Sequence, residues 1–95
     1  MADRYYIGLV HKDEDSSYGI SFPDALGVIA SEDTLDDVMR EGAIALGFAF
    51  ETWDGPLPEP RSIEDLRHDP EFLEWSKDAI IVAVKPEPAV AVAAE

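Results

Sequence analysis

The sequence predicts an α+β domain in which one main helix packs on one face of an antiparallel sheet. Three observations support this fold class: segments with strand-like composition come first, a strongly amphipathic helix follows, and an apolar strand closes the chain. A length of 95 residues suits one domain with a thin core. We therefore expect a three-stranded antiparallel meander plus a closing strand within residues 1–85, followed by a flexible tail over residues 86–95.

The predicted meander begins with residues 4–12 (RYYIGLVHK), which are rich in aromatic and β-branched side chains. Alternation in this segment places Tyr6 and Val10 on the same face. Residues 17–22 alternate between large apolar and small side chains, as expected of a half-buried strand. A turn rich in proline, aspartate and glycine separates them from residues 28–30, which are short enough to form an edge strand.

The predicted main helix begins after Thr34, a favourable N-cap residue, and runs for about 18 residues. Asp36 and Asp37 lie in its first turn, where the helix dipole favours negative charge. Apolar residues at helical spacing form one stripe: Leu35, Val38, Met39, Gly42, Leu46, Ala49, Phe50 and Trp53. Ile44 and Phe48 fall on the opposite face, where they are either simply exposed or part of an association surface.

The remaining chain closes the domain. Ser62 is expected to cap a short helix over residues 63–67, and Asp69-Pro70 to start another helical turn. Residues 79–84 (AIIVAV) are apolar on both faces. This pattern predicts a strand that is buried on both sides or lies inside the sheet.

The charge balance excludes several classes of function. Acidic residues number 21 against 7 basic ones, and the net charge of −14 with scattered basic residues disfavours binding of nucleic acid. The absence of cysteine excludes disulfides and thiolate chemistry. No segment resembles a signal peptide or a membrane span, so we expect a soluble cytoplasmic protein.

No motif predicts catalysis, a metal or a cofactor. The strands predicted over residues 4–12 and 79–84 contain no carboxylate, which disfavours a two-metal nuclease site. The acidic run at residues 13–15 resembles part of a calcium loop, but a solvated turn is the better interpretation. We interpret His11 and His68 as structural or surface residues, since no nucleophile is placed to use them.

Two runs resemble the HicB family of antitoxins. Residues 18–28 (YGISFPDALGV) are similar to a family strand that ends in Phe-Pro-Asp-Leu-Pro-Gly-Cys, with Ala25-Leu26 in place of Leu-Pro and Val28 in place of Cys. Residues 33–38 (DTLDDV) are similar to the start of the family's helix, Asp-Thr-Leu-Glu-Glu-Ala. The resemblance implies a partial, catalytically inactive ribonuclease H-like fold.

The resemblance also implies a function and a partner. HicB proteins bind and neutralise HicA, a small basic toxin that cleaves messenger RNA, and an acidic surface would attract such a protein. We expect the contact surface to use acidic residues near exposed turns and on the outer helix face. The predicted contact residues are Asp13, Glu14, Asp15, Asp36, Asp37 and Glu41.

Self-association is also expected, with Tyr6, Val10, Ile44 and Phe48 at the interface between copies. Many HicB proteins carry a C-terminal DNA-binding segment, whereas this sequence ends in an alanine- and valine-rich tail. We therefore expect no direct DNA binding by this chain alone. The alternative interpretation is a stand-alone, homo-oligomeric domain with a ligand-binding or regulatory role.

Overall fold

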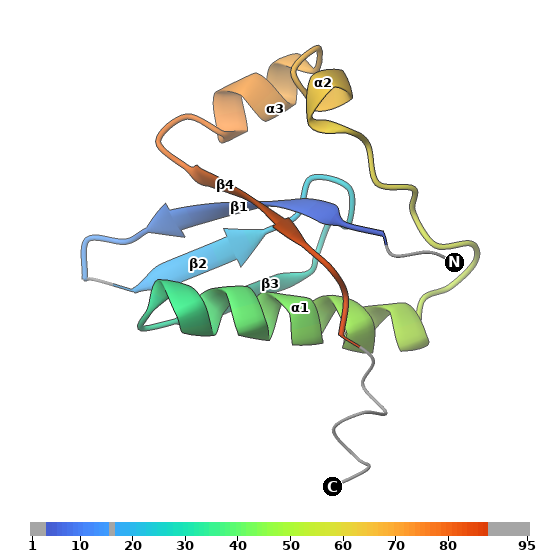
Figure 1. The fold of residues 1–95 in the computed structure, drawn as a ribbon, viewed down its shortest axis with the longest axis horizontal. Helices are drawn as coiled ribbons and strands as arrows, with labels where there is room; N and C mark the ends of the chain where they lie inside the picture. The colour runs from blue at the N-terminus through green and yellow to red at the C-terminus, as the bar shows by residue number, and fades with distance from the viewer. Residues whose placement is uncertain (1–3, 16, 88–95) are drawn as a thin grey trace, which may run out of the picture.

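The computed structural model describes residues 4–15 and 17–87. Its strands pair antiparallel in the order β3-β2-β1-β4, so that β1 is central and β4 closes one side (Figure 1). This arrangement confirms the predicted α+β class, with a meander, a closing strand and a main helix. In chain order the elements are β1 (Tyr6–Lys12), β2 (Tyr18–Ser21), β3 (Ile29–Glu32), α1 (Leu35–Glu51), α2 (Ile63–Leu66), α3 (Pro70–Trp75) and β4 (Ile80–Val84). The predicted tail lies outside the described residues from position 88 onward.

Turn chemistry sets the register of the meander. The backbone N–H of Asp13 donates to the carbonyl of Ser17 at 2.7 Å and closes the turn between β1 and β2. The turn after β2 ends at Gly27, whose φ of +95° lies in the left-handed region that glycine adopts without strain. β3 then forms one residue later than predicted and pairs with β2 at the edge of the sheet.

The start of α1 is as predicted. Thr34 is the N-cap, and its Oγ1 accepts a hydrogen bond from the backbone N–H of Asp37 at 3.1 Å. Gly42 lies on the buried face, where an added Cβ would be only 3.1 Å from Cγ2 of Ile20. The absence of a side chain at Gly42 therefore lets α1 approach β2 closely.

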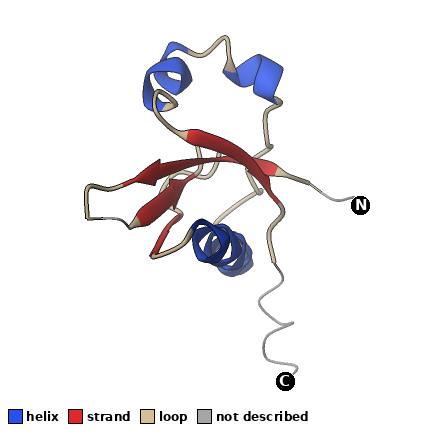
Figure 2. Ribbon diagram, turned by 60° about the vertical axis from the view of Figure 1, so that its left-hand side comes forward, coloured by secondary structure: helices blue, strands red, loops and turns tan. Residues whose placement is uncertain are grey.

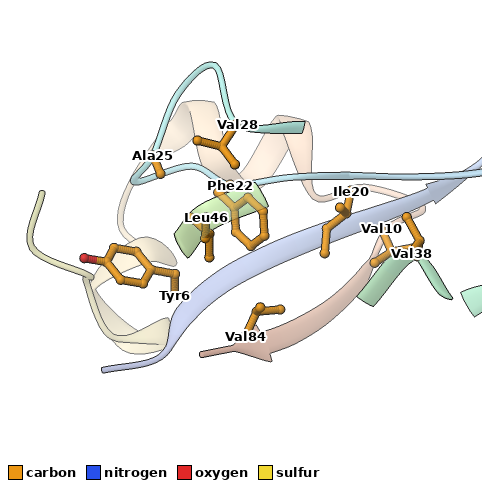
Figure 3. Close-up of a cluster of buried hydrophobic side chains, with 9 residues drawn as sticks. All are labelled: Tyr6, Val10, Ile20, Phe22, Ala25, Val28, Val38, Leu46 and Val84. Atoms are coloured by element: carbon orange, nitrogen blue, oxygen red, sulfur yellow. The ribbon is translucent and has the colours of Figure 1, made fainter. Parts of the chain in front are cut away.

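Helices lie on both faces of the sheet (Figure 2), and apolar side chains are buried on each face. α1 covers one face and packs mainly against β2 and β3. The shorter helices α2 and α3 cover the other face, where Leu9 packs with Leu66 and Phe72. The larger cluster, on the α1 face, comprises Tyr6, Val10, Ile20, Phe22, Ala25, Val28, Val38, Leu46 and Val84 (Figure 3).

The structure corrects the expectation that Tyr6 and Val10 contribute to self-association. Their side chains are only 2% and 1% exposed, because they fill the core between the sheet and α1 of the same chain. The Tyr6 hydroxyl donates a hydrogen bond to the carbonyl of Pro58 at 2.6 Å. Burial raises the pKa of Tyr6, which further favours the protonated hydroxyl that donates this bond.

The prediction for the closing strand is wrong in its position. β4 pairs with β1 on one side and is an edge strand of the sheet, rather than a strand buried on both sides. Because α1 lies mainly beneath β2 and β3, it covers little of β4. Ile80, which pairs with Val10 on the α1 face, is consequently 46% exposed, and Ile81, on the opposite face, is 43% exposed.

After β4 the chain crosses α1. The backbone N–H of Glu87 donates to the carbonyl of Ala43 at 2.9 Å. A Cβ at Gly47 would lie 1.5 Å from the Glu87 carbonyl oxygen, so the crossing requires glycine at this position of the helix.

Candidate protein-binding surface

The fold brings both groups of predicted acidic contact residues to one end of the sheet. Lys12, at the end of β1, pairs with Tyr18, and Tyr18 pairs with Glu32, at the end of β3. The turn between β1 and β2 and the start of α1 are therefore neighbours at the same end of the molecule (Figure 1).

We call this surface the acidic end. Its seven carboxylates belong to Asp13, Glu14, Asp15, Glu32, Asp33, Asp36 and Asp37. Two of them, Glu32 and Asp33, were not predicted, because only the register of β3 shows that they join this end. The predicted Glu41 lies one helical turn beyond Asp37 and extends the same negative charge along α1.

The acidic end has few cations of its own. Lys12 places its Nζ 5.5 Å from the centre of the Tyr18 ring. Arg40 forms an ion pair with Asp37 across one turn of α1. Seven carboxylates against these two cations leave a strong negative field at this end.

Hydrogen bonds favour the ionised form of one of these carboxylates. Oδ1 of Asp15 accepts from the backbone N–H of Ser17 at 3.2 Å and from its hydroxyl at 3.0 Å. These bonds lower the pKa of Asp15. Among residues 4–15 and 17–87, no group of three or more histidine, aspartate or glutamate side chains is arranged to hold a metal ion.

A second polar cluster is built around Arg61, which sequence reasoning did not single out. Its backbone N–H and its Nε donate to the carboxylate of Asp24 at 2.7 and 2.8 Å. Its Nη1 donates to Asp69 at 3.1 Å and lowers the pKa of that carboxyl. Arg61 therefore ties the turn after β2 to the start of α3, which is a structural use of these charges.

A shallow cavity of about 190 Å³ adjoins this cluster. Leu26, Phe72 and Trp75 contribute apolar surface to its lining. The charges of Arg61 and Asp69 at its rim are paired with each other. Glu71 is the third charged side chain of the lining.

Neither histidine lines this cavity. Nε2 of His11 is 3.1 Å from the carbonyl of Trp75, a hydrogen bond that links β1 to the end of α3. His68 is exposed. These positions agree with structural and surface roles for His11 and His68.

The structure is thus a small α+β domain with an acidic surface at one end of its sheet. The chain is similar to the crystal structure of the N-terminal domain of the Burkholderia pseudomallei antitoxin HicB, with a TM-score of 0.68 and 25% identity over 87% of this chain and 98% of that one. It is also similar to the crystal structure of the Burkholderia pseudomallei antitoxin HicB, with a TM-score of 0.69 and 26% identity over 88% of this chain. That alignment spans 62% of the second protein.

Residues 6–92 match the family model of the HicB-like antitoxin of bacterial toxin–antitoxin systems. The chain therefore belongs to this family. No curated protein matches the sequence significantly. Membership of an antitoxin family implies a toxin partner and points to a non-enzymatic role.

Proposed function

We propose that this chain binds and neutralises a small basic toxin of the HicA type in the cytoplasm, without catalysing a reaction itself. Family membership supports an antitoxin role, and the acidic end supplies the surface that would attract a basic protein. Among the described residues, no helix is long and apolar enough to cross a membrane.

The acidic end is the proposed toxin-contact surface because it concentrates charge at the rim of the fold. Its carboxylates lie on a turn and at a helix start, where a partner can approach without rearranging the core. Charges at such a rim accelerate encounter and orient the partner more than they add affinity. The proposed surface therefore predicts an association rate that falls steeply as salt is added.

Co-expression with the product of the adjacent reading frame tests the proposal. We expect a complex in gel filtration at low salt and faster toxin association at low salt than at high salt. The test variant reverses three charges of the acidic end, Asp13→Lys, Glu14→Lys and Asp36→Lys. It should slow association at least about tenfold at low salt.

The matched control carries Glu51→Lys, Asp54→Lys and Glu64→Lys, all at exposed positions outside the acidic end. It changes the net charge by the same amount as the test variant. It therefore distinguishes attraction of the toxin by the acidic end from attraction by the net charge of the whole chain. Equal slowing by both variants would contradict the acidic end as the contact surface. No complex at low salt would contradict the function itself.

We also propose that the chain alone does not bind operator DNA. The net charge is −14, and Arg4, Lys12, Arg40 and Arg61 each form an ion pair or a cation–π contact within the fold. An electrophoretic mobility assay with the promoter region at low salt tests this. A specific shift by the isolated chain would contradict it.

A further inference from the structure

The outer edge of β4 has the features of a pairing edge. The five-residue strand contains no charged residue and no proline, and it pairs with β1 without a bulge from Tyr6↔Val84 to Val10↔Ile80. No other strand in residues 4–15 and 17–87 pairs with its far side. An edge strand of this kind offers a row of backbone donors and acceptors to another chain.

The opposite edge of the sheet is protected in ways that β4 is not. β3 has four residues, ends at Glu32 and continues into Asp33. Short length and charge are the usual means by which edge strands avoid pairing. α1 also packs against β3, whereas it makes little contact with β4.

The local charge indicates which partner suits this edge. Residues 77–87 contain Lys77 and Lys85 against Asp78 and Glu87, so this segment is neutral in a chain of net charge −14. A basic toxin gains no attraction from a neutral strand. Two copies of an acidic chain, in contrast, repel each other least where their surfaces are neutral.

We propose that two copies of this chain pair antiparallel through β4 and form a continuous eight-stranded sheet about a two-fold axis. Such a symmetric pair places one residue opposite its own copy. With Val82 at this centre, all five strand residues pair, with Ile80 opposite Val84 and Ile81 opposite Ala83.

Neighbouring registers fit less well. A centre at Ile81 would set Asp78 opposite Val84, and a centre at Ala83 would set Lys85 opposite Ile81. In each case a charged side chain would face an apolar one across the strands. The register centred on Val82 avoids both arrangements.

This self-association goes beyond toxin binding, because it uses the chain alone and a surface separate from the acidic end. It also differs from the predicted association surface on the outer face of α1, where Phe48 is 65% exposed and Ile44 is half-buried. The experiment must therefore distinguish association through β4 from association through β3 or through the outer face of α1.

Sedimentation equilibrium of the isolated chain over a range of concentrations measures the association. We expect a dimer, and Ile81→Lys should weaken it at least about tenfold, because it puts a charge beside the paired strands. Ile29→Lys is the matched control on the opposite edge, since Ile29 is also exposed. It should leave the dimer unchanged, and circular dichroism checks that each variant is folded.

Cysteine cross-linking tests the register. The chain has no cysteine, so a single introduced cysteine forms only disulfides between copies. Directly opposed Cα atoms in antiparallel strands are about 4.5–5.5 Å apart, within disulfide range. Val82→Cys should therefore cross-link rapidly on mild oxidation, and Ile29→Cys and Phe48→Cys should not.

Three results would overturn the proposal: a monomeric chain at all concentrations, dissociation by Ile29→Lys but not by Ile81→Lys, or preferential cross-linking through Phe48→Cys. Toxin is absent from these samples, so none of these results bears on toxin binding. A toxin complex that fails to form while the β4 dimer persists would contradict only the proposed function.

Discussion

The two faces of the sheet are stabilised in different ways. The α1 face buries a large cluster beneath one 17-residue helix with a defined N-cap. The opposite face has a small cluster around Leu9, Leu66 and Phe72, covered by helices of only four and six residues. Helices this short are not stable alone, so their position depends on packing and on the Arg61 cluster. The comparison sets a large cluster beneath one long helix against a small cluster beneath two short helices on the same sheet.

Removal of a large side chain from the α1 face should have the largest effect. We expect Phe22→Ala to lower the free energy of unfolding by about 3–5 kcal/mol, because the Phe22 ring is buried between Gly8 of β1 and Gly42 of α1. Urea denaturation measures this loss. Phe48→Ala, at an exposed position, is the control and should change stability by less than about 0.5 kcal/mol. Similar losses in both variants would contradict the assignment of the core.

A substitution on the face covered by α2 and α3 should have a smaller and more local effect. Leu66→Ala should lower the free energy of unfolding by about 2–3 kcal/mol. This is at the low end for such a substitution, because short helices can shift to fill the cavity that the lost side chain leaves. Amide hydrogen exchange should increase in α2 and α3 and change little in α1. Leu73→Ala, at an exposed position, is the control. Faster exchange throughout α1 would show that the two faces unfold together.

Loss of the Arg61 cluster should have a smaller effect still. Arg61→Gln removes the charge that ties Asp24 to Asp69. We expect the free energy of unfolding to fall by less than about 1 kcal/mol, because the Arg61 side chain is 41% exposed. The loss should shrink in high salt. Urea denaturation at two salt concentrations measures both effects, and a loss that salt leaves unchanged would contradict an electrostatic role.

The same cluster predicts a dependence on acid. Arg61 lowers the pKa of Asp69 in the folded state. The contribution of this pair to folding stability is therefore complete above the ordinary aspartate pKa, and it is lost as pH falls through the lowered pKa. Arg61→Gln should therefore lose less stability than the natural sequence between neutral pH and pH of about 3. An identical acid dependence in both proteins would contradict this linkage.

A substitution at Gly47 should disturb the crossing of Glu87 over α1 while changing overall stability very little. Gly47→Ala removes the space for the crossing, but alanine favours the helix by about 1 kcal/mol over glycine. We expect a small net change in stability and faster exchange of the Glu87 amide. Gly42→Ala is the control, since its Cβ meets Ile20 and Phe22 and leaves Glu87 in place.

Local sequence patterns were reliable wherever a single element carried the information. The cap at Thr34, the buried stripe of α1 and the proline start of α3 all follow from neighbouring residues, and the structure confirms them. The family resemblance, based on residues 18–28 and 33–38, is also confirmed by the match over residues 6–92.

Patterns that depend on neighbours in space were less informative. The apolar run of β4 predicted burial on both sides, but the strand lies at an edge that α1 covers little. Tyr6 and Val10 could not be assigned from the sequence, because which sheet face receives α1 is a property of the packed chain. Glu32 joins the acidic end only through its pairing with Tyr18.

The sequence by itself therefore determined the type and approximate extent of each element, the acidic character of the chain and its family. These properties depend on residue composition, on short-range periodicity and on turn residues. Only the tertiary structure decided which strand became the open edge and which carboxylates became neighbours. Those outcomes depend on strand order and register, which arise from pairing between segments far apart in the chain.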